Sequence, residues 1–187
     1  MHRVTYSMGM SADGYVIDAT GSFDFSEPSA EVFAFHIEEI RAVGVHLLGR
    51  RLHETMLYWE DPDNAATFTG AEREWAALWN PLPKVVFSRT LTEVAAPARL
   101  ATEGLAAEIA RLREEPGEGD IAVGGADLAR QAAEQGLIDE YQVFVHPALV
   151  GGGTPFFAND GQRVPLTLAE SRAFDSGVTF QRYRVER

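Results

Sequence analysis

The chain has 187 residues, 45% of them hydrophobic, which is enough for one globular domain with a sizeable core and requires no second core. Twenty-eight acidic residues against sixteen basic ones give a formal charge of −12, and this charge disfavours non-specific binding to nucleic acids or to anionic membranes. The sequence contains no cysteine, so disulfides, thiolate metal sites and cysteine nucleophiles are excluded.

The N-terminal quarter predicts a strand, a loop and a helix. Residues 3–10 alternate apolar and polar side chains, the pattern of a strand, and run into a turn at Asp13-Gly14. Residues 17–29 are rich in Asp, Gly, Ser and Pro, so we expect a loop that either covers a site or is a surface excursion. Apolar residues at helical spacing then predict an amphipathic helix from about Ala30 to Gly44.

Two short apolar segments in the middle of the chain each end in polar residues suited to a ligand. Residues 45–48 predict a strand that runs into Gly49-Arg50-Arg51 and a helix, an arrangement that can hold a phosphate. Residues 69–72 have the spacing of a capping box and predict the start of another helix. Residues 84–87 predict a further strand, and Ser88-Arg89-Thr90 follows it directly.

The stretch from Ile121 to Phe157 organises the second half of the chain. It reads as strand, Gly124-Gly125 turn, helix to Gly136, strand, and a triple-glycine loop. A double glycine between a strand and a helix lets the backbone approach a ligand, and the helix N-terminus presents free N–H groups. We therefore predict an anion site suited to a diphosphate, with an ordinary tight turn as the alternative.

The C-terminal segment is predicted to be β-rich. A turn is expected at residues 159–161, a strand around residues 166–168, and a closing strand at residues 178–185. Because strands and helices alternate before it, the whole chain predicts an α/β protein with a mainly parallel sheet and an antiparallel C-terminal edge.

Several common motifs are absent. There is no G-x-G-x-x-G in a first βα unit and no G-x-x-x-x-G-K-[ST], so the chain must hold a nucleotide in another way. His53-Glu54 begins like H-E-x-x-H, but Leu57 stands where the second histidine should be, and no metal site is expected. The absence of a signal-peptide pattern and of a long apolar run predicts a cytoplasmic protein that binds no membrane.

The three polar strand ends occur in a recognisable order. Followed by G-L-I-D-E-Y and P-A-L-V-G-G-G-T-P-F-F, they make the chain resemble the dihydrofolate reductase-like superfamily, and more narrowly the C-terminal reductase domain of bacterial riboflavin biosynthesis proteins. The resemblance covers nearly the whole chain. It implies a single domain over residues 1–187 with a three-layer α/β/α fold, a mostly parallel central sheet, a homodimer, and NADPH as the cofactor for reducing a pyrimidine or pterin-like heterocycle.

The resemblance also implies roles for particular residues. Those that match the cofactor-binding turns of the family are Gly49, Arg50, Arg51, Ser88, Arg89, Gly124, Gly125 and Ala126. Arginine near the ribose suits the 2′-phosphate of NADPH, whereas an acidic residue would select NADH. One departure is that Leu52 and His53 stand where the family commonly has threonine, which removes a hydroxyl that could bond the diphosphate.

Catalytic candidates are fewer, because hydride transfer needs mainly positioning, exclusion of water and a proton source. Glu31, with Asp24 behind it, lies near the start of the first long helix, where the reductase family places a carboxylate. Asp13 and Thr154 are further candidates near the nicotinamide and the substrate. Each has a structural alternative: Glu31 as a partner of the helix dipole, and the other two as turn residues.

The nearest named activity is 5-amino-6-(5-phosphoribosylamino)uracil reductase of riboflavin biosynthesis. A deaminase half with a P-C-x-x-C zinc signature is excluded, because the chain has no cysteine. The alternatives are a dihydrofolate reductase and a non-catalytic nucleotide-binding or interaction protein on the same fold.

Overall fold

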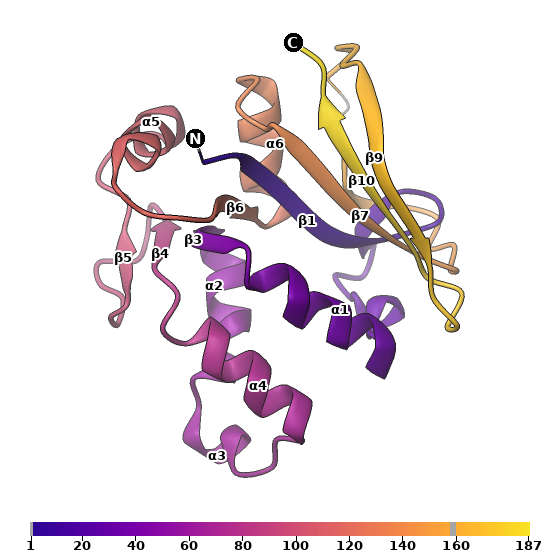
Figure 1. Cartoon of the computed structure of the whole chain (residues 1–187), viewed down its shortest axis with the longest axis horizontal. Helices are drawn as coiled ribbons and strands as arrows, with labels where there is room; N and C mark the ends of the chain where they lie inside the picture. The colour runs from indigo at the N-terminus through magenta and orange to yellow at the C-terminus, as the bar shows by residue number, and fades with distance from the viewer. Residues whose placement is uncertain (1, 158–159) are drawn as a thin grey trace.

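The computed structural model describes residues 2–157 and 160–187 and is built on one large β-sheet (Figure 1). Its strands are β1 (Val4–Ser11), β3 (Val43–Gly49), β4 (Lys84–Phe87), β5 (Ala98–Leu100), β6 (Asp120–Gly124), β7 (Glu140–His146), β9 (Leu166–Ala173) and β10 (Thr179–Val185). They lie in the order β5-β4-β3-β6-β1-β7-β10-β9. The pairs from β5 to β7 are parallel, and β10 is antiparallel to both of its neighbours. The predicted sheet is thus confirmed.

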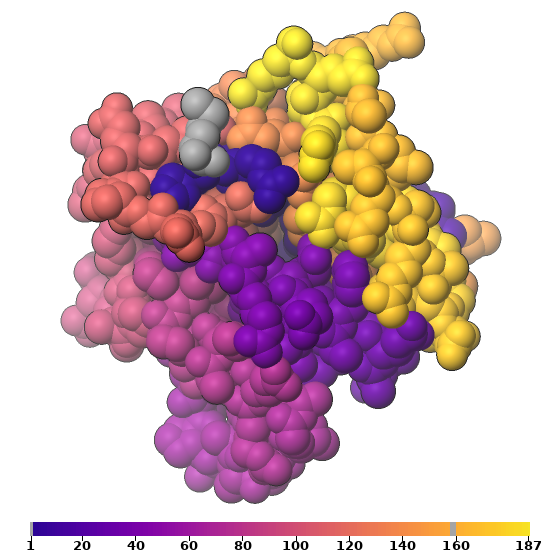
Figure 2. Space-filling view, in the orientation of Figure 1, coloured from indigo at the N-terminus to yellow at the C-terminus, as the bar shows by residue number. Residues whose placement is uncertain are grey.

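Helices cover both faces of this sheet (Figure 1). α5 (Leu105–Glu114) and α6 (Ala126–Glu134) pack on one face, and α1 (Ala30–Ile40), α2 (Arg50–Met56) and α4 (Gly70–Trp79) pack on the other. Successive residues of β3 show the division, because Leu47 packs with α5 and α6 whereas Leu48 packs with α1 and α4. Figure 2 shows α4 and the short α3 (Pro62–Ala65) as a protrusion at the bottom of the view.

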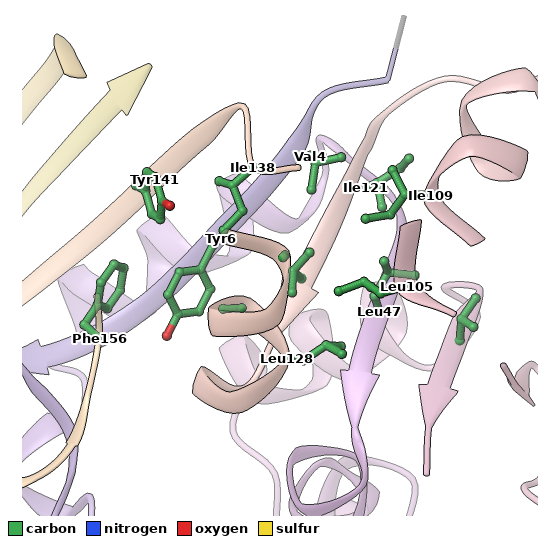
Figure 3. Close-up of a cluster of buried hydrophobic side chains, with 14 of the residues drawn as sticks. Val4, Tyr6, Leu47, Leu105, Ile109, Ile121, Leu128, Ile138, Tyr141 and Phe156 are labelled. Atoms are coloured by element: carbon green, nitrogen blue, oxygen red, sulfur yellow. The ribbon is translucent and has the colours of Figure 1, made fainter. Parts of the chain in front are cut away.

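The largest hydrophobic core lies between the sheet and the pair α5 and α6 (Figure 3). Tyr6 of β1 is fully buried, its ring centroid lies 4.4 Å from that of Phe156, and it meets Tyr141 edge-on at 6.4 Å. Burying a ring such as that of Phe156 contributes about 1.5–3 kcal/mol. This core fixes β1 and β7 against α6, and so fixes the strand ends on which the candidate site is built.

Two helix boundaries and one turn bear on the sequence predictions. The side chain of Ser29 caps α1, and Thr69 and Glu72 form the predicted capping box of α4. α1 ends at Ile40 rather than near Gly44. Gly44 lies instead in β3, where a Cβ would stand 2.5 Å from the carbonyl oxygen of Glu118. The turn expected at residues 159–161 falls partly outside the described residues.

A small second sheet replaces the beginning of the predicted loop at residues 17–29. β2 (Tyr15–Asp18) pairs antiparallel with β8 (Gly153–Pro155). Gly153 has φ +135°, and a Cβ there would lie 2.0 Å from the carbonyl oxygen of Ile17. The third glycine of the triple is therefore required by the close approach of these two strands. β5 and α3 were not predicted either, because each is too short to show a period.

His46, in β3, gives the fold a dependence on pH. Its Nδ1 is buried without a hydrogen-bond partner among the described residues, and desolvation lowers the pKa of His46 from 6.5 to about 4. Between these two values the unfolded chain binds a proton that the folded chain does not, so acid favours unfolding.

We expect the free energy of unfolding to fall by up to about 1.4 kcal/mol per pH unit over this range because of His46. Urea unfolding of the wild type and of His46→Leu, at neutral pH and at about pH 5, measures this loss of stability. The variant should lose less stability on acidification. An identical loss in both proteins would contradict the assignment.

Candidate cofactor and substrate cleft

A cleft of about 1010 Å³ lies at the carboxyl ends of the parallel strands. Its lining includes Gly49 at the end of β3, Phe87 at the end of β4, and Gly125 directly after β6. In open parallel sheets this edge is the usual place for ligands. The strand order brings together the three polar segments that are far apart in the sequence, as predicted.

The helices that begin at the cleft are capped differently from those that begin elsewhere. α2, α5 and α6 have Gly49, Gly104 and Gly125 as N-caps, with no side-chain hydrogen bond to the first turn. α1 and α4 begin away from the cleft and have full side-chain caps. The first N–H groups of α5 and α6 are therefore left for another acceptor, and the helix dipole favours an anion there.

The two glycines at the start of α6 are needed for different reasons. Gly125 has φ +93°, a conformation that L-residues rarely adopt, and it lines the cleft. Gly124 is not among the residues lining the cleft; a Cβ there would lie 2.6 Å from His46 and 2.7 Å from Leu52. Gly124 thus allows α2 to pack closely on β6, while Gly125 and Ala126 form the cleft wall.

Four arginines and two acidic residues line the cleft of this acidic protein. The arginines that line the cleft are Arg50, Arg51, Arg89 and Arg130, against the acidic residues Glu103 and Asp127. Arg50 is paired with Glu54 at 3.0 Å, and Arg130 is paired with Glu134. Arg51 and Arg89 form no salt bridge with any residue in ranges 2–157 and 160–187, so their guanidinium groups are available to an anionic ligand.

Ser88 shapes the turn that presents Arg89. Its hydroxyl oxygen accepts hydrogen bonds from the backbone N–H groups of Thr90 at 3.1 Å and Leu91 at 3.0 Å. Ser88, Arg89 and Thr90 all line the cleft. Ser88 is therefore first a turn residue, and its hydroxyl proton is still able to reach a ligand.

The opposite end of the cleft is apolar. It is formed by β1, β2, β8 and the segment before α1, and its lining residues are Met8, Gly9, Val16, Ile17, Phe23, Ser26 and Thr154. Phe23 is 52% exposed, although it is a large apolar side chain. This end suits a planar ring more than a phosphate. Thr154 is the one predicted catalytic candidate that lines the cleft.

Glu31 lies away from the cleft lining. Its carboxylate pairs with Arg172 at 3.0 Å and accepts the backbone N–H of Asp175 at 3.1 Å. The bond from Asp175, with help from Arg172, lowers the pKa of Glu31. The group is held as a carboxylate that joins α1 to the turn between β9 and β10, a structural role that was not among those expected for it.

Asp13 is also outside the cleft lining, and its carboxylate links two loops by hydrogen bonds. It accepts hydrogen bonds from Ser11 Oγ at 2.6 Å, from the N–H of Gly151 at 2.7 Å and from the N–H of Val150 at 3.2 Å. The bond from Ser11 is the main cause of its lowered pKa. Asp13 ties the turn after β1 to the triple-glycine loop that leads to Thr154.

Several cleft residues carry no recognisable signal in the sequence. Gly104 caps the helix after β5 as Gly49 caps the helix after β3, but β5 has only three residues and was not recognised as a strand. Arg130 lies one turn inside α6 and belongs to no recognisable sequence motif. Phe23 lies in the segment expected to be a loop, where nothing in the sequence marks it as a cleft residue. No group of three or more potential metal ligands occurs in the described parts of the chain, and none of its described helices is long and apolar enough to cross a membrane.

A mostly parallel sheet with glycine-capped helices and arginines at its carboxyl edge defines an α/β protein with a ligand-sized cleft at that edge. The family model for the RibD C-terminal domain matches residues 2–180. The chain therefore belongs to the RibD C-terminal domain family, and its fold is the predicted dihydrofolate reductase-like fold.

Individual relatives agree with this assignment. The uncharacterized protein YyaP of Bacillus subtilis is 28% identical over 181 residues, which cover 94% of this chain and 91% of YyaP. The crystal structure of a putative riboflavin biosynthesis protein from Shewanella sp. PV-4 matches over the full length of both chains with a TM-score of 0.77 and 23% identity. RibD of Acinetobacter baumannii matches all of this chain and 58% of its own length, with a TM-score of 0.69 and 18% identity.

Proposed function

We propose that this protein is an NADPH-dependent reductase of a pyrimidine or pterin-like heterocycle, with 5-amino-6-(5-phosphoribosylamino)uracil reductase as the nearest named activity. One observation carries the proposal: a single cleft has a cationic end with uncapped helix N-termini and an apolar end with few polar groups. A dinucleotide with a phosphorylated ribose and a flat ring has the matching distribution of charge. Membership of the RibD C-terminal domain family supports the same reaction class.

The residues present fit NADPH. The N-terminus of α6, at Gly125 and Ala126, offers N–H groups to a diphosphate, and Arg51 can add a charge-assisted hydrogen bond. Arg89, on the turn built by Ser88, is free to pair with a 2′-phosphate. When bound, the cofactor supplies a hydride. Leu52 lines the cleft where the family commonly has threonine, so the backbone N–H groups must hold the diphosphate without that hydroxyl.

The chain's own contribution to the reaction is placement. Met8, Val16, Ile17 and Phe23 exclude water from the apolar end, which strengthens any electrostatic interaction there. Thr154 offers a hydroxyl that can donate to or accept from the substrate ring. Asp13 holds the loop before Thr154 in place and thus acts as a positioning residue.

Calorimetric binding of NADPH and NADH tests the cofactor assignment. NADPH should bind at least about tenfold more tightly than NADH, and Arg89→Ala should weaken NADPH binding by about ten- to a hundredfold, because one or two charge-assisted hydrogen bonds are lost. NADH binding should change little. Arg163→Ala, an arginine outside the cleft lining, is the matched control. Equal affinity for both nucleotides in the wild type would refute the role of Arg89.

One observation favours the non-catalytic alternative. Glu31 is engaged with Arg172 and Asp175, and among the described residues no carboxylate lines the apolar end of the cleft. A dihydrofolate reductase that uses a carboxylate at the start of α1 is disfavoured for the same reason. Oxidation of NADPH in the presence of a reducible aminouracil distinguishes an enzyme from a binding protein: turnover supports the proposal, and binding without turnover supports the alternative.

A further inference from the structure

His146 is a buried imidazole for which the fold gives no structural partner. It is the last residue of β7, lies beside Ser11 of β1, and is only 3% exposed. Phe25 meets its ring edge-on at 6.4 Å. Desolvation alone lowers the pKa of His146, and its ring forms no hydrogen bond with the described residues. Neither ring nitrogen of His146 is among the side-chain atoms that are fully buried without a partner, so the question is what the imidazole can reach.

His146 is not itself among the residues that line the cleft, but its Nε2 lies directly behind Gly9, which is. A Cβ at residue 9 would lie 3.0 Å from His146 Nε2 and 3.4 Å from the Cβ of Ser26. Gly9 and Ser26 both line the cleft. The space that any side chain at residue 9 would fill is therefore bounded on one side by His146 Nε2 and on the other by a residue of the cleft wall.

The surroundings of this space limit what it can bind. The nearby lining residues Met8, Val16, Ile17 and Phe23 are apolar, and the arginines of the cleft belong to the elements at its other end. The hydroxyl of Ser26 already donates to the carbonyl oxygen of Phe23 at 2.7 Å. A neutral imidazole can donate or accept at Nε2, so it can recognise the polar edge of a flat ring but offers no charge for a phosphate.

We propose that His146 Nε2 forms a hydrogen bond with the polar edge of the substrate heterocycle, through the opening that Gly9 leaves in the cleft wall. The ligand class is a planar ring with an amide or amino edge, such as an aminouracil or a pterin. This inference rests on the proposed function, because it assigns the apolar end of the cleft to the ring that is reduced. The competing explanation is a core histidine for which Gly9 merely makes room.

The test is calorimetric titration of the full-length protein with 5,6-diaminouracil and with 7,8-dihydropterin, both with and without saturating NADPH. His146→Leu removes the hydrogen-bonding atoms, whereas His146→Gln keeps an amide group near the position of Nε2. Gly9→Ala keeps the His146 side chain and places a methyl group against its Nε2, and Gly70→Ala, where a Cβ meets nothing within 4 Å, is its matched control. Melting temperature and NADPH affinity report whether each variant is folded.

We expect at least one of the two rings to bind the wild type, and binding to weaken at least about tenfold in His146→Leu and in Gly9→Ala. His146→Gln and Gly70→Ala should stay within about threefold of the wild type, and NADPH affinity should be unchanged in Gly70→Ala. If His146→Leu does not fold, Gly9→Ala decides alone.

Unchanged ring binding in Gly9→Ala and in a folded His146→Leu would overturn the inference, and so would a wild type that binds neither ring. Failure of NADPH to bind would refute the proposed cofactor instead, and the titrations without NADPH would still decide the role of His146.

Discussion

Gly153→Ala should lower the free energy of unfolding by about 2–4 kcal/mol, from backbone strain and steric overlap together. The residue has φ +135°, and the new Cβ would lie 2.0 Å from the carbonyl oxygen of Ile17. Since a backbone oxygen in a ladder has little freedom to move, β2 and β8 must separate. Thr154 follows directly, so ligand binding at the apolar end of the cleft should weaken as well. Urea unfolding and ring titration measure the two effects.

Gly151→Ala is the matched control in the same loop. Gly151 also has a positive φ, +74°, but a Cβ there meets nothing within 4 Å. Gly151→Ala should lower the free energy of unfolding by about 1 kcal/mol, because only the left-handed backbone conformation disfavours alanine there. Equal destabilisation by the two substitutions would show that backbone conformation, and not the contact with Ile17, decides the need for glycine at residue 153.

Glu140→Leu should lower the free energy of unfolding by roughly 2–3 kcal/mol, because it leaves arginines without their buried partner. Glu140 is fully buried in β7. Its carboxylate accepts from Arg3 at 3.2 Å, from Gln142 at 2.9 Å and from Arg182 at 3.4 Å, and Arg184 lies 3.7 Å away. The arginines are partly exposed, which keeps the cost below that of a fully buried network. Chemical denaturation measures it.

Glu170→Gln removes a different partner of the same arginine. Glu170 is half-exposed on the edge strand β9 and pairs with Arg182 at 3.1 Å. An exposed pair contributes about 0–1 kcal/mol and is weakened by salt. We therefore expect a small effect that disappears at high ionic strength, in contrast to Glu140→Leu. A larger loss in Glu170→Gln than in Glu140→Leu would mean that burial does not decide the strength of this network.

The sequence predicted the sheet well, because its long strands and helices have clear periods and clear ends. Thr69 and Glu72, for example, form the capping box that their spacing indicates. The sequence did not predict β5 or the β2–β8 pair. These strands have three or four residues each and are held by neighbours distant in the chain. Short strands of this kind are specified by tertiary contacts, and those leave no local pattern.

The candidate site was predictable where it depends on strand ends and not where it depends on distant contacts. Gly49, Arg89 and Gly125 line one cleft because the carboxyl ends of parallel strands meet. Glu31 was proposed from its place at a helix start, and the sequence gives no hint that Arg172, 141 positions further on, engages it. His146 carries no motif either. Its significance depends on Gly9, which lies beside it only in the folded sheet.

Glycine at the start of α5 could be exchanged for a residue that stabilises the protein but occupies a backbone N–H group beside the cleft. Gly104 has φ −69° and ψ 161°, nearly the backbone of Ser29, which caps α1. A serine at residue 104 would fit without strain and add a few tenths of a kcal/mol. It would also occupy an N–H group that now faces the cleft. Selection for thermostability alone would therefore favour serine at residue 104, whereas selection for ligand binding would favour glycine. The glycine is a compromise between stability and binding.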